Sequence, residues 1–382
     1  MKNTCSKEYF NEETTRLFNL KYDEYEYDYY LFKSVNNSMV EPLLRISNID
    51  KYVLICDNNI KGLYIDKIKE LIGPEKCIVI SFEGGEDNKT LSVVNNMIEE
   101  ILSYKVTRRA CIVGVGGGIV GNMAGMVAAL LFRGLKLVHI PTSLMAILDS
   151  VISLKQAINS SQGKNLIGCF YKPELVITSI EFLNTLPKEH IISGLCEVIK
   201  NAFIILPDSI DKLSNILNSE GIYTEEDFNY FIDMSIESKQ KLMLNDYKER
   251  KEALVLEYGH TIGHAIELSS KGEVNHGQGV GLGMICAAEI SRRLGYLTSD
   301  DVNLHIELLS KNGSLLKLPH SIKAEDILNI IRYDNKRGYL KKDKDKQNLV
   351  ILKEIGEPLM QDDMCLVGVE EELIKDVINE IL

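Results

Sequence analysis

The first half of the chain alternates short, continuous hydrophobic runs with amphipathic segments. Residues 51–57 form one such run, and residues 91–104 show the 3.6-residue period of a helix with one apolar face. Continuous apolar strands that alternate with helices are typical of a parallel sheet covered on both faces. Residues 1–48 predict strand-rich material at a sheet edge. The strands predicted here are 22–32, 51–57, 76–82, 111–116, 136–140 and 174–178, and the helices are 91–104 and 121–133.

The period changes to 3.6 residues after Thr185-Leu186-Pro187, and helical patterns dominate from there. We therefore predict two domains, an α/β domain over 1–180 and a mostly α-helical domain over 181–382. The helices predicted in the second domain are 190–205, 225–245, 253–270, 279–294, 300–311 and 324–331. A hairpin of 348–352 with 364–367 and a terminal helix complete the prediction.

Composition describes an ordinary globular protein, with 45% hydrophobic and 26% charged residues. The net charge of -12 argues against a nucleic-acid or anionic-membrane partner, because either would require a basic face. The polar N-terminal segment predicts no signal peptide, and no apolar run is long enough to span a bilayer. Eight scattered cysteines without a CxxC pair suit reduced thiols, so we expect a cytoplasmic protein.

A glycine-rich turn follows the predicted strand 111–116 and opens a helix. It contains GxGxxG in the register Gly116, Gly118, Gly121. Such glycines let backbone N–H groups approach a pyrophosphate at a helix N-terminus. The usual acid about twenty residues later is missing, whereas Asp57 and residues 84–89 offer partners for a ribose or adenine. The alternative interpretation is tight helix–strand packing.

The stretch Leu256-Glu257-Tyr258-Gly259-His260-Thr261-Ile262-Gly263-His264 places two imidazoles at i, i+4 on one helical face. His276 follows, and Glu197 lies upstream. Two His and one carboxylate leave open positions on a divalent metal, which is the composition of a catalytic site. The alternative is a His pair that is solvated or satisfied within the core.

Taken together, these motifs resemble the sugar phosphate cyclases, the family of dehydroquinate synthase. The resemblance covers nearly the whole chain. It rests on 116–125, Arg133-Gly134, Pro141-Thr142-Ser143, Asp149-Ser150, Lys155, 163–168, 185–187, 197–200, 259–265 and His276-Gly277. It implies a Rossmann-like, parallel-sheet NAD-binding domain, a helical metal-binding domain and an active site in the cleft between them.

The resemblance also implies roles for single residues. Glu197, His260 and His276 resemble the ligands of one Co²⁺ or Zn²⁺ ion, and His264 resembles a substrate-facing residue. Substrate or proton-transfer roles are implied for Lys155, Glu257, Lys200, Lys239, Asp149, Arg133, Asn165 and Lys336. NAD-binding roles are assigned to Asp57, Asn59, Glu86, Lys89, Gly117, Gly118, Gly121, Asn122, Thr142, Ser143, Lys164 and Thr185. Arg133 resembles a residue that reaches the partner subunit's site, which implies a homodimer.

Two positions depart from the dehydroquinate synthase pattern. Ala253 stands where those enzymes typically have Arg, and Glu257 stands where they have Asn. An Arg fork is the natural partner of a substrate carboxylate, and its loss removes an interaction of about 1.5–3 kcal/mol. Ala253 and Glu257 therefore favour a neutral polyol head with a phosphate tail. Gln278 also departs from the pattern, and we expect it to change the basicity of His276 through outer contacts.

The motifs around Glu257, with 82–91 and 334–339, resemble the branch that makes the carbocycle of 2-deoxystreptamine antibiotics from glucose 6-phosphate. That resemblance implies transient oxidation by NAD, phosphate elimination, re-reduction and an intramolecular aldol closure. The alternatives are dehydroquinate synthase or another cyclase, a metal- and NAD-dependent polyol dehydrogenase, and a non-enzymatic binding subunit.

Overall fold

The computed structural model describes residues 14–333, 339 and 345–381. The chain divides into two compact units, Met1–Leu186 and Pro187–Leu382. The division lies six residues beyond the boundary expected near residue 180. Lys336, which we assigned to the substrate phosphate, lies outside the described residues.

The first unit is built on a seven-stranded sheet with the strand order β1-β2-β9-β6-β5-β3-β4. The edge pair β1–β2 is antiparallel, and every other pairing is parallel. The strands are β1 (Thr14–Tyr22), β2 (Tyr25–Phe32), β3 (Lys51–Asp57), β4 (Cys77–Phe82), β5 (Ala110–Gly116), β6 (Lys136–Pro141) and β9 (Leu175–Ser179). The predicted α/β fold class is confirmed.

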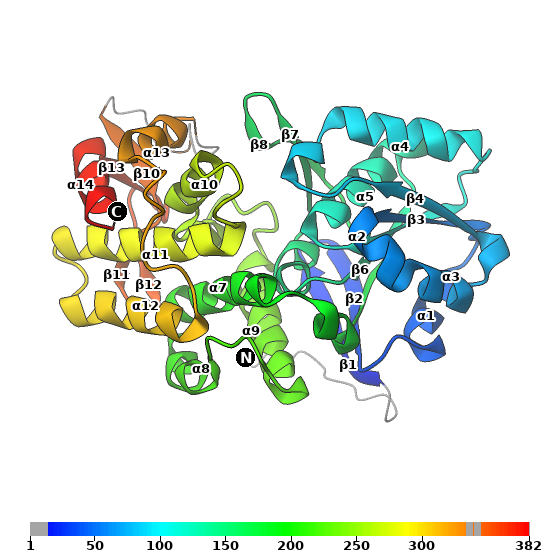
Figure 1. Ribbon diagram of the computed structural model, residues 1–382, viewed down its shortest axis with the longest axis horizontal. Coiled ribbons are helices and arrows are strands. Elements are labelled where there is room, and N and C mark those ends of the chain that lie inside the picture. The colour runs from blue at the N-terminus through cyan, green and yellow to red at the C-terminus, as the bar shows by residue number, and fades with distance from the viewer. Residues whose placement is uncertain (1–13, 334–338, 340–344, 382) are drawn as a thin grey trace. The chain divides into compact units, whose positions relative to one another are not determined.

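Side chains alternate between two hydrophobic cores, one on each face of this sheet. Val53 and Ile55 of β3 pack with α4 (Leu91–Ser103) and α5 (Gly118–Leu130). Leu54 and Cys56 pack on the other face with α1 (Asn37–Leu44) and α3 (Asp66–Ile72). Figure 1 shows these helices covering the two faces. Both faces are therefore buried, which explains the continuous apolar runs.

Sequence patterns missed several features of the first unit. The helices α1, α3 and α6 (Leu144–Leu148) were not predicted, and neither was the antiparallel hairpin of β7 (Lys155–Ser160) and β8 (Gly163–Phe170). Polar and half-exposed residues dominate this hairpin, so it carries no hydrophobic period. It matters for function because it carries Lys155, Lys164 and Asn165.

The second unit is helical. Its central helix, α11, packs against α7, α10, α12 and α14. The helices are α7 (Lys188–Ile204), α8 (Ile210–Ile216), α9 (Glu225–Met243), α10 (His260–Ser269), α11 (His276–Arg293), α12 (Ser299–Asn312), α13 (Ala324–Ile331) and α14 (Glu371–Ile381). Among the described residues, no helix is both long enough and apolar enough to cross a membrane.

The predicted continuous helix over 253–270 is wrong. Residues Glu252–Glu257 form a 3-10 helix, and α10 begins only at His260. Gly259 lies between them in the left-handed region, with φ of 76°. A side chain there would be strained, so Gly259 breaks the helix and makes His260 the first residue of a new one.

The predicted late hairpin is only partly correct. β10 (Lys346–Leu349) pairs with β13 (Val367–Glu370), so that Leu349 lies opposite Val367. The other residues of the prediction separate from this pair: β11 (Leu352–Glu354) pairs with β12 (Glu357–Pro358), and Met364 forms an isolated bridge with Gln361. An apolar run cannot specify its partner, because pairing depends on the intervening turn.

His139 is a buried polar group in the core of the first unit. Its ring lies beside Gly114 and Gly121, under the glycine turn, and neither ring nitrogen has a hydrogen-bond partner among the described residues. Burial lowers the pKa of His139 from 6.5 to about 4. The neutral ring is tolerated in the fold, but its protonation would be costly.

We expect His139 to make the protein acid-sensitive. Because its folded-state pKa lies below the unfolded value, its contribution is complete above pH 6.5 and is lost as the pH falls toward 4. Between pH 7 and pH 4.5, the free energy of unfolding should fall in both the wild-type protein and His139→Leu. The fall should be about 2–3 kcal/mol larger in the wild-type protein. Denaturant titrations at both pH values measure the difference. The exposed His190, replaced by Gln, is the control and should leave the pH dependence unchanged.

Candidate metal centre and cofactor site

Helix α7 places a carboxylate and an ammonium group together in the interior of the second unit. Glu197 and Lys200 are each 1% exposed. They lie three residues apart on one helix face, and Lys200 Nζ donates to Glu197 Oε2 at 2.5 Å. A buried carboxylate requires such a partner.

Two imidazoles approach the other oxygen of Glu197. Oε1 lies 3.4 Å from His260 Nε2 and 3.6 Å from His276 Nε2. Ligands that each stand about 2.1 Å from one tetrahedral ion are separated from one another by about 3.4 Å. Glu197 Oε1 is also buried without a hydrogen-bond partner among the described residues. The three side chains therefore fit a divalent metal ion.

His264 joins this cluster. Ligand nitrogens of His260, His264 and His276 all lie within 4.8 Å of one another, and the rings stand 5.2–5.5 Å apart between centroids. From the sequence we assigned His264 to the substrate rather than to the metal. The geometry places it close enough for either role, so the assignment stays a prediction.

Each of the two imidazoles that face Glu197 has a different outer partner. His260 Nδ1 donates to the Tyr258 carbonyl at 3.1 Å, so in the neutral ring Nε2, which faces Glu197, is the atom that can bind a metal. His276 Nδ1 lies 3.3 Å from Glu267 Oε2. We expected Gln278 to act on His276, but its amide oxygen accepts from the Leu315 backbone instead.

Opposing charges set the ionisation of this cluster. Burial alone would raise the pKa of Glu197, but Lys200 and His260 outweigh it and hold the pKa well below 4.5. Burial would lower the pKa of His276, whereas the neighbouring carboxylates of Glu197 and Glu267 raise it to about 10. A metal cation that replaced the proton on His276 would be attracted by the same carboxylates, Glu197 and Glu267.

Close helix packing brings the three side chains together. A Cβ on Gly277 of α11 would lie 2.0 Å from the Ser193 carbonyl oxygen of α7, one turn before Glu197. A Cβ on Gly263 of α10 would lie 2.7 Å from the Gly279 carbonyl oxygen of α11. The helices can approach this closely only without side chains at these positions.

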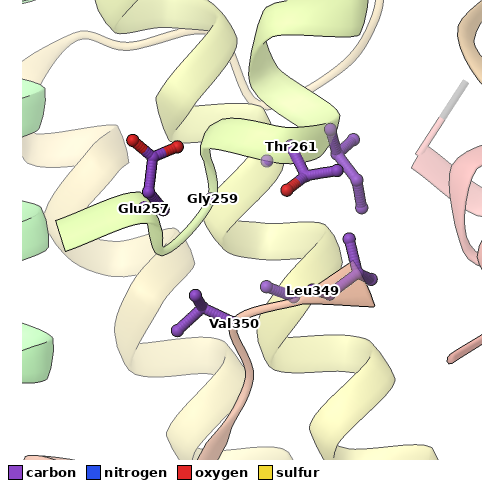
Figure 2. Close-up of a pocket in the computed structure, with 8 residues that line it drawn as sticks. Glu257, Gly259, Thr261, Leu349 and Val350 are labelled. Atoms are coloured by element: carbon purple, nitrogen blue, oxygen red, sulfur yellow. The ribbon is translucent and has the colours of Figure 1, made fainter. Parts of the chain in front are cut away.

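Glu257 lies on a small cavity beside the turn that carries His260. The cavity has a volume of about 10 Å³, which is room for about one water molecule and too little for a sugar. Figure 2 shows Glu257 and Thr261 on one side, with Leu349 and Val350 opposite. Contact between Glu257 and substrate hydroxyls therefore stays a prediction.

In the first unit, the glycine turn has the structure that the motif predicted. β5 ends at Gly116, Gly117 is the N-cap residue, and α5 begins at Gly118. The Ser143 hydroxyl lies beside Gly117, and the adjacent Thr142 is buried. Asn122 has a local structural role, because its amide donates to the Gly118 carbonyl and accepts from the Ala157 N–H at 2.7 Å.

The β7–β8 hairpin joins four of the predicted residues in one polar network. Lys89 Nζ donates to Asn165 Oδ1 at 2.6 Å, and Lys164 Nζ lies 3.8 Å from Glu86 Oε1. Asn159, which the sequence did not single out, links the pairs by donating to Glu86 and accepting from the Asn165 N–H. Asn165, assigned to the substrate phosphate, thus lies in one network with three residues assigned to the cofactor, Glu86, Lys89 and Lys164.

The remaining predicted residues occupy separate places. Asp57 caps α2 (Asn58–Ile60) by accepting from the Asn59 and Ile60 N–H groups. Thr185 shares a 2.7 Å hydrogen bond with Tyr64. Arg133 is exposed, Asp149 follows α6, Lys155 begins β7, and Lys239 is buried on α9.

Two tyrosines hold the segment that carries Asp149. The Tyr29 hydroxyl donates to the Ile147 carbonyl, and the Tyr27 hydroxyl lies 3.1 Å from the Ile152 carbonyl oxygen. Both side chains are buried on β2. Because Tyr27 and Tyr29 are two residues apart in a predicted strand, the sequence indicates that they lie on the same face of the sheet. It does not indicate which residues they bond.

Comparison with known proteins assigns the chain to a family. The family model of the 3-dehydroquinate synthase N-terminal domain matches residues 79–193. The model of the 3-dehydroquinate synthase C-terminal domain matches residues 194–337. The chain belongs to the dehydroquinate synthase family. The resemblance inferred from the motifs is thereby confirmed.

Several similar proteins are 2-deoxy-scyllo-inosose synthases. The 2-deoxy-scyllo-inosose synthase of Micromonospora echinospora is 42% identical over 90% of this chain and 87% of its own length. A crystal structure of 2-deoxy-scyllo-inosose synthase with carbaglucose-6-phosphate, NAD⁺ and Co²⁺ matches 96% of this chain and 100% of its own, with 35% identity and a TM-score of 0.89. A 2-epi-5-epi-valiolone synthase from Streptomyces hygroscopicus, with NAD⁺ and Zn²⁺, shares the fold at 18% identity and a TM-score of 0.81, over 94% of this chain and 97% of its own.

The packing of α11 on α7 predicts the effect of Gly277→Ala. The new methyl group would collide with backbone atoms of Ser193, so the helices must separate. We expect a loss of about 1–3 kcal/mol in unfolding free energy and at least about tenfold weaker Co²⁺ binding. Chelator competition and thermal unfolding measure the two quantities.

Gly281→Ala on the same helix is the matched control. Its methyl group would meet the Leu309 side chain rather than backbone, so Co²⁺ affinity should stay near wild type. Equal Co²⁺ affinity in both variants would contradict the role assigned to this packing.

Proposed function

We propose that this protein is a sugar phosphate cyclase that converts glucose 6-phosphate to 2-deoxy-scyllo-inosose and phosphate. The convergence of Glu197, His260 and His276 carries the proposal, because it supplies a site for a catalytic metal. The named relatives, at about 40% identity over most of the chain, support this choice of reaction.

The proposed cofactors are NAD and one divalent metal ion, Co²⁺ or Zn²⁺. When bound, the metal would polarise a substrate hydroxyl, and NAD would accept a hydride and return it. Glu197, His260 and His276 would hold the metal, with Lys200 keeping Glu197 ionised. The glycine turn at 116–121 and the network of Glu86, Lys89 and Lys164 would hold NAD, together with Asp57, Asn59, Asn122, Thr142, Ser143 and Thr185.

Other residues are proposed to orient the sugar phosphate. Lys155, Asn165 and Lys336 would bind the phosphate while it leaves. Lys200, Lys239 and Asp149 would bind substrate hydroxyls, and His264 and Glu257 would position hydroxyls and transfer protons. One intermediate must stay oriented through all the steps, and these fixed polar groups would provide that orientation.

The choice of a neutral sugar rests on Ala253 and Glu257. Ala253 has an uncharged methyl side chain, which is fully buried, so this position offers no cation to a substrate carboxylate. Its backbone N–H donates to Asp246. Glu257 would repel a carboxylate and accept hydrogen bonds from hydroxyl groups. Both features favour glucose 6-phosphate over the acidic substrate of dehydroquinate synthase.

The family resemblance motivates three further proposals. We propose that the protein is a homodimer in which Arg133 reaches the partner's site, and the exposed position of Arg133 is compatible with this. We also propose that it acts in the cytoplasm and in the biosynthesis of an aminoglycoside antibiotic. Eight scattered cysteines, seven of which are described and free, suit a reducing compartment.

The reaction is tested with purified protein, Co²⁺, NAD and glucose 6-phosphate. We expect about one phosphate per carbocycle, identified by mass spectrometry, without lasting NADH absorbance, because the hydride returns within each turnover. Preferred turnover of a carboxylated seven-carbon sugar phosphate would instead identify dehydroquinate synthase activity. NADH accumulating in step with product, without phosphate, would identify a polyol dehydrogenase.

His260→Ala tests the metal centre. Loss of an outer partner alone costs 10–100-fold in metal affinity or activity, so loss of a proposed ligand should weaken Co²⁺ binding by more than about 100-fold and abolish phosphate release. His320→Ala removes an exposed imidazole of the same unit and should change neither quantity. Full phosphate release by His260→Ala would contradict the role proposed for this metal centre, and no phosphate release by the wild-type protein would favour a binding or regulatory protein instead.

A further inference from the structure

Tyr258 carries two contacts that face in different directions. Its backbone carbonyl accepts from His260 Nδ1 at 3.1 Å, and its hydroxyl lies 3.0 Å from His305 Nε2. The side chain is completely buried. Tyr258 therefore joins the candidate metal centre to a residue 47 positions later in the chain.

The hydrogen bonds of His305 determine which atom donates. His305 Nδ1 lies 2.8 Å from the Asp301 carbonyl oxygen, which can only accept, so Nδ1 carries the proton. The neutral ring then offers Nε2 as an acceptor, and the Tyr258 hydroxyl donates to it. Burial lowers the pKa of His305 to about 4, so the ring is neutral at pH 7.

His305 is also fixed against the helix that carries Glu197. Its ring stacks on Phe203 of α7, with 3.6 Å between centroids and 8° between planes. Asp301 and His305 both belong to α12. A rigid joint of Phe203, His305 and Tyr258 thus ties the His260 turn to α7, independently of any contact between Glu197 and His260.

The backbone of the Tyr258-Gly259-His260 turn does little by itself to fix the hydrogen bond between the Tyr258 carbonyl and His260 Nδ1. Gly259 separates Tyr258 from α10, and its left-handed conformation is one that glycine adopts readily among several others. Rotation of the Tyr258 peptide would remove the acceptor from His260 Nδ1. The imidazole would then lose both its orientation and the tautomer that leaves Nε2 open to a metal.

We infer that Tyr258 and His305 are positioning residues, which act through the Tyr258 carbonyl to orient His260 for metal binding. The inference rests on the proposed metal centre. It assigns an outer partner to His260 comparable to the one that Glu267 provides for His276. It also gives a function to a buried histidine that the proposed reaction does not use.

The test uses the full-length protein and Co²⁺ alone as the probe. Tyr258→Phe removes one hydroxyl and keeps the ring, and we expect about tenfold weaker Co²⁺ binding in chelator competition, with a shift in the Co²⁺ visible spectrum. Tyr223→Phe is the matched control. It removes a tyrosine hydroxyl that bonds the Asn218 backbone in the same unit, so it should lower the melting temperature without weakening Co²⁺ binding.

A double-mutant cycle with His305→Phe separates positioning from general stability. If one hydrogen bond carries the effect, the double variant should bind Co²⁺ about as weakly as the weaker single variant. Additive losses would contradict the inference, and so would a Tyr258→Phe variant that lowers the melting temperature but binds Co²⁺ like wild type. Failure of the wild-type protein to bind Co²⁺ would refute the proposed metal centre itself.

Discussion

Contact between helix backbones underlies the candidate metal centre. Where α11 meets α7, Gly277 lies so close to the Ser193 carbonyl that no Cβ fits between them, and where α11 meets α10, Gly263 lies against Gly279 in the same way. These contacts are one turn or less from Glu197, His276 and His260. Because the side chains of Glu197, in the middle of α7, and of His260 and His276, at the starts of α10 and α11, must reach a common point, the distance between the helix backbones decides whether a donor set exists at all.

Electrostatics imposes a second condition on the same place. A carboxylate that is 1% exposed must have its charge balanced, and Lys200 and two imidazoles provide the balance for Glu197. Lys200 takes one oxygen and leaves the other facing the imidazoles. The outer partners, the Tyr258 carbonyl and Glu267, then orient those rings. The carboxylate, the ammonium group and the imidazoles stabilise one another, because burying any one of them without the others would cost free energy.

The first unit follows a different principle, in which the sheet organises the polar groups. Strand β5, buried on both faces, ends at the glycine turn. The half-exposed β7–β8 hairpin carries Lys164 and Asn165, which form a polar network with Lys89 and Glu86. Tyr27 and Tyr29 of β2 hold the segment that includes Asp149. The candidate chemistry thus lies on turns and on the hairpin rather than in the sheet core.

Periodicity and motifs in the sequence were sufficient for the fold class, for most helices and strands, and for the family, because burial on two sheet faces and on one helix face leaves a direct record in hydropathy. They also singled out Glu197, His260 and His276 as one group, although only by resemblance. Spacing could not show that Gly259 interrupts a helix, that Leu349 pairs with Val367, or that the polar β7–β8 strands form a hairpin. Nor could it identify Glu267, Asn159 or the Tyr258–His305 pair, because these contacts join segments whose separation in sequence carries no period. Tertiary packing decided them, since a hydrogen bond between distant residues exists only once the helices between them have fixed their distance.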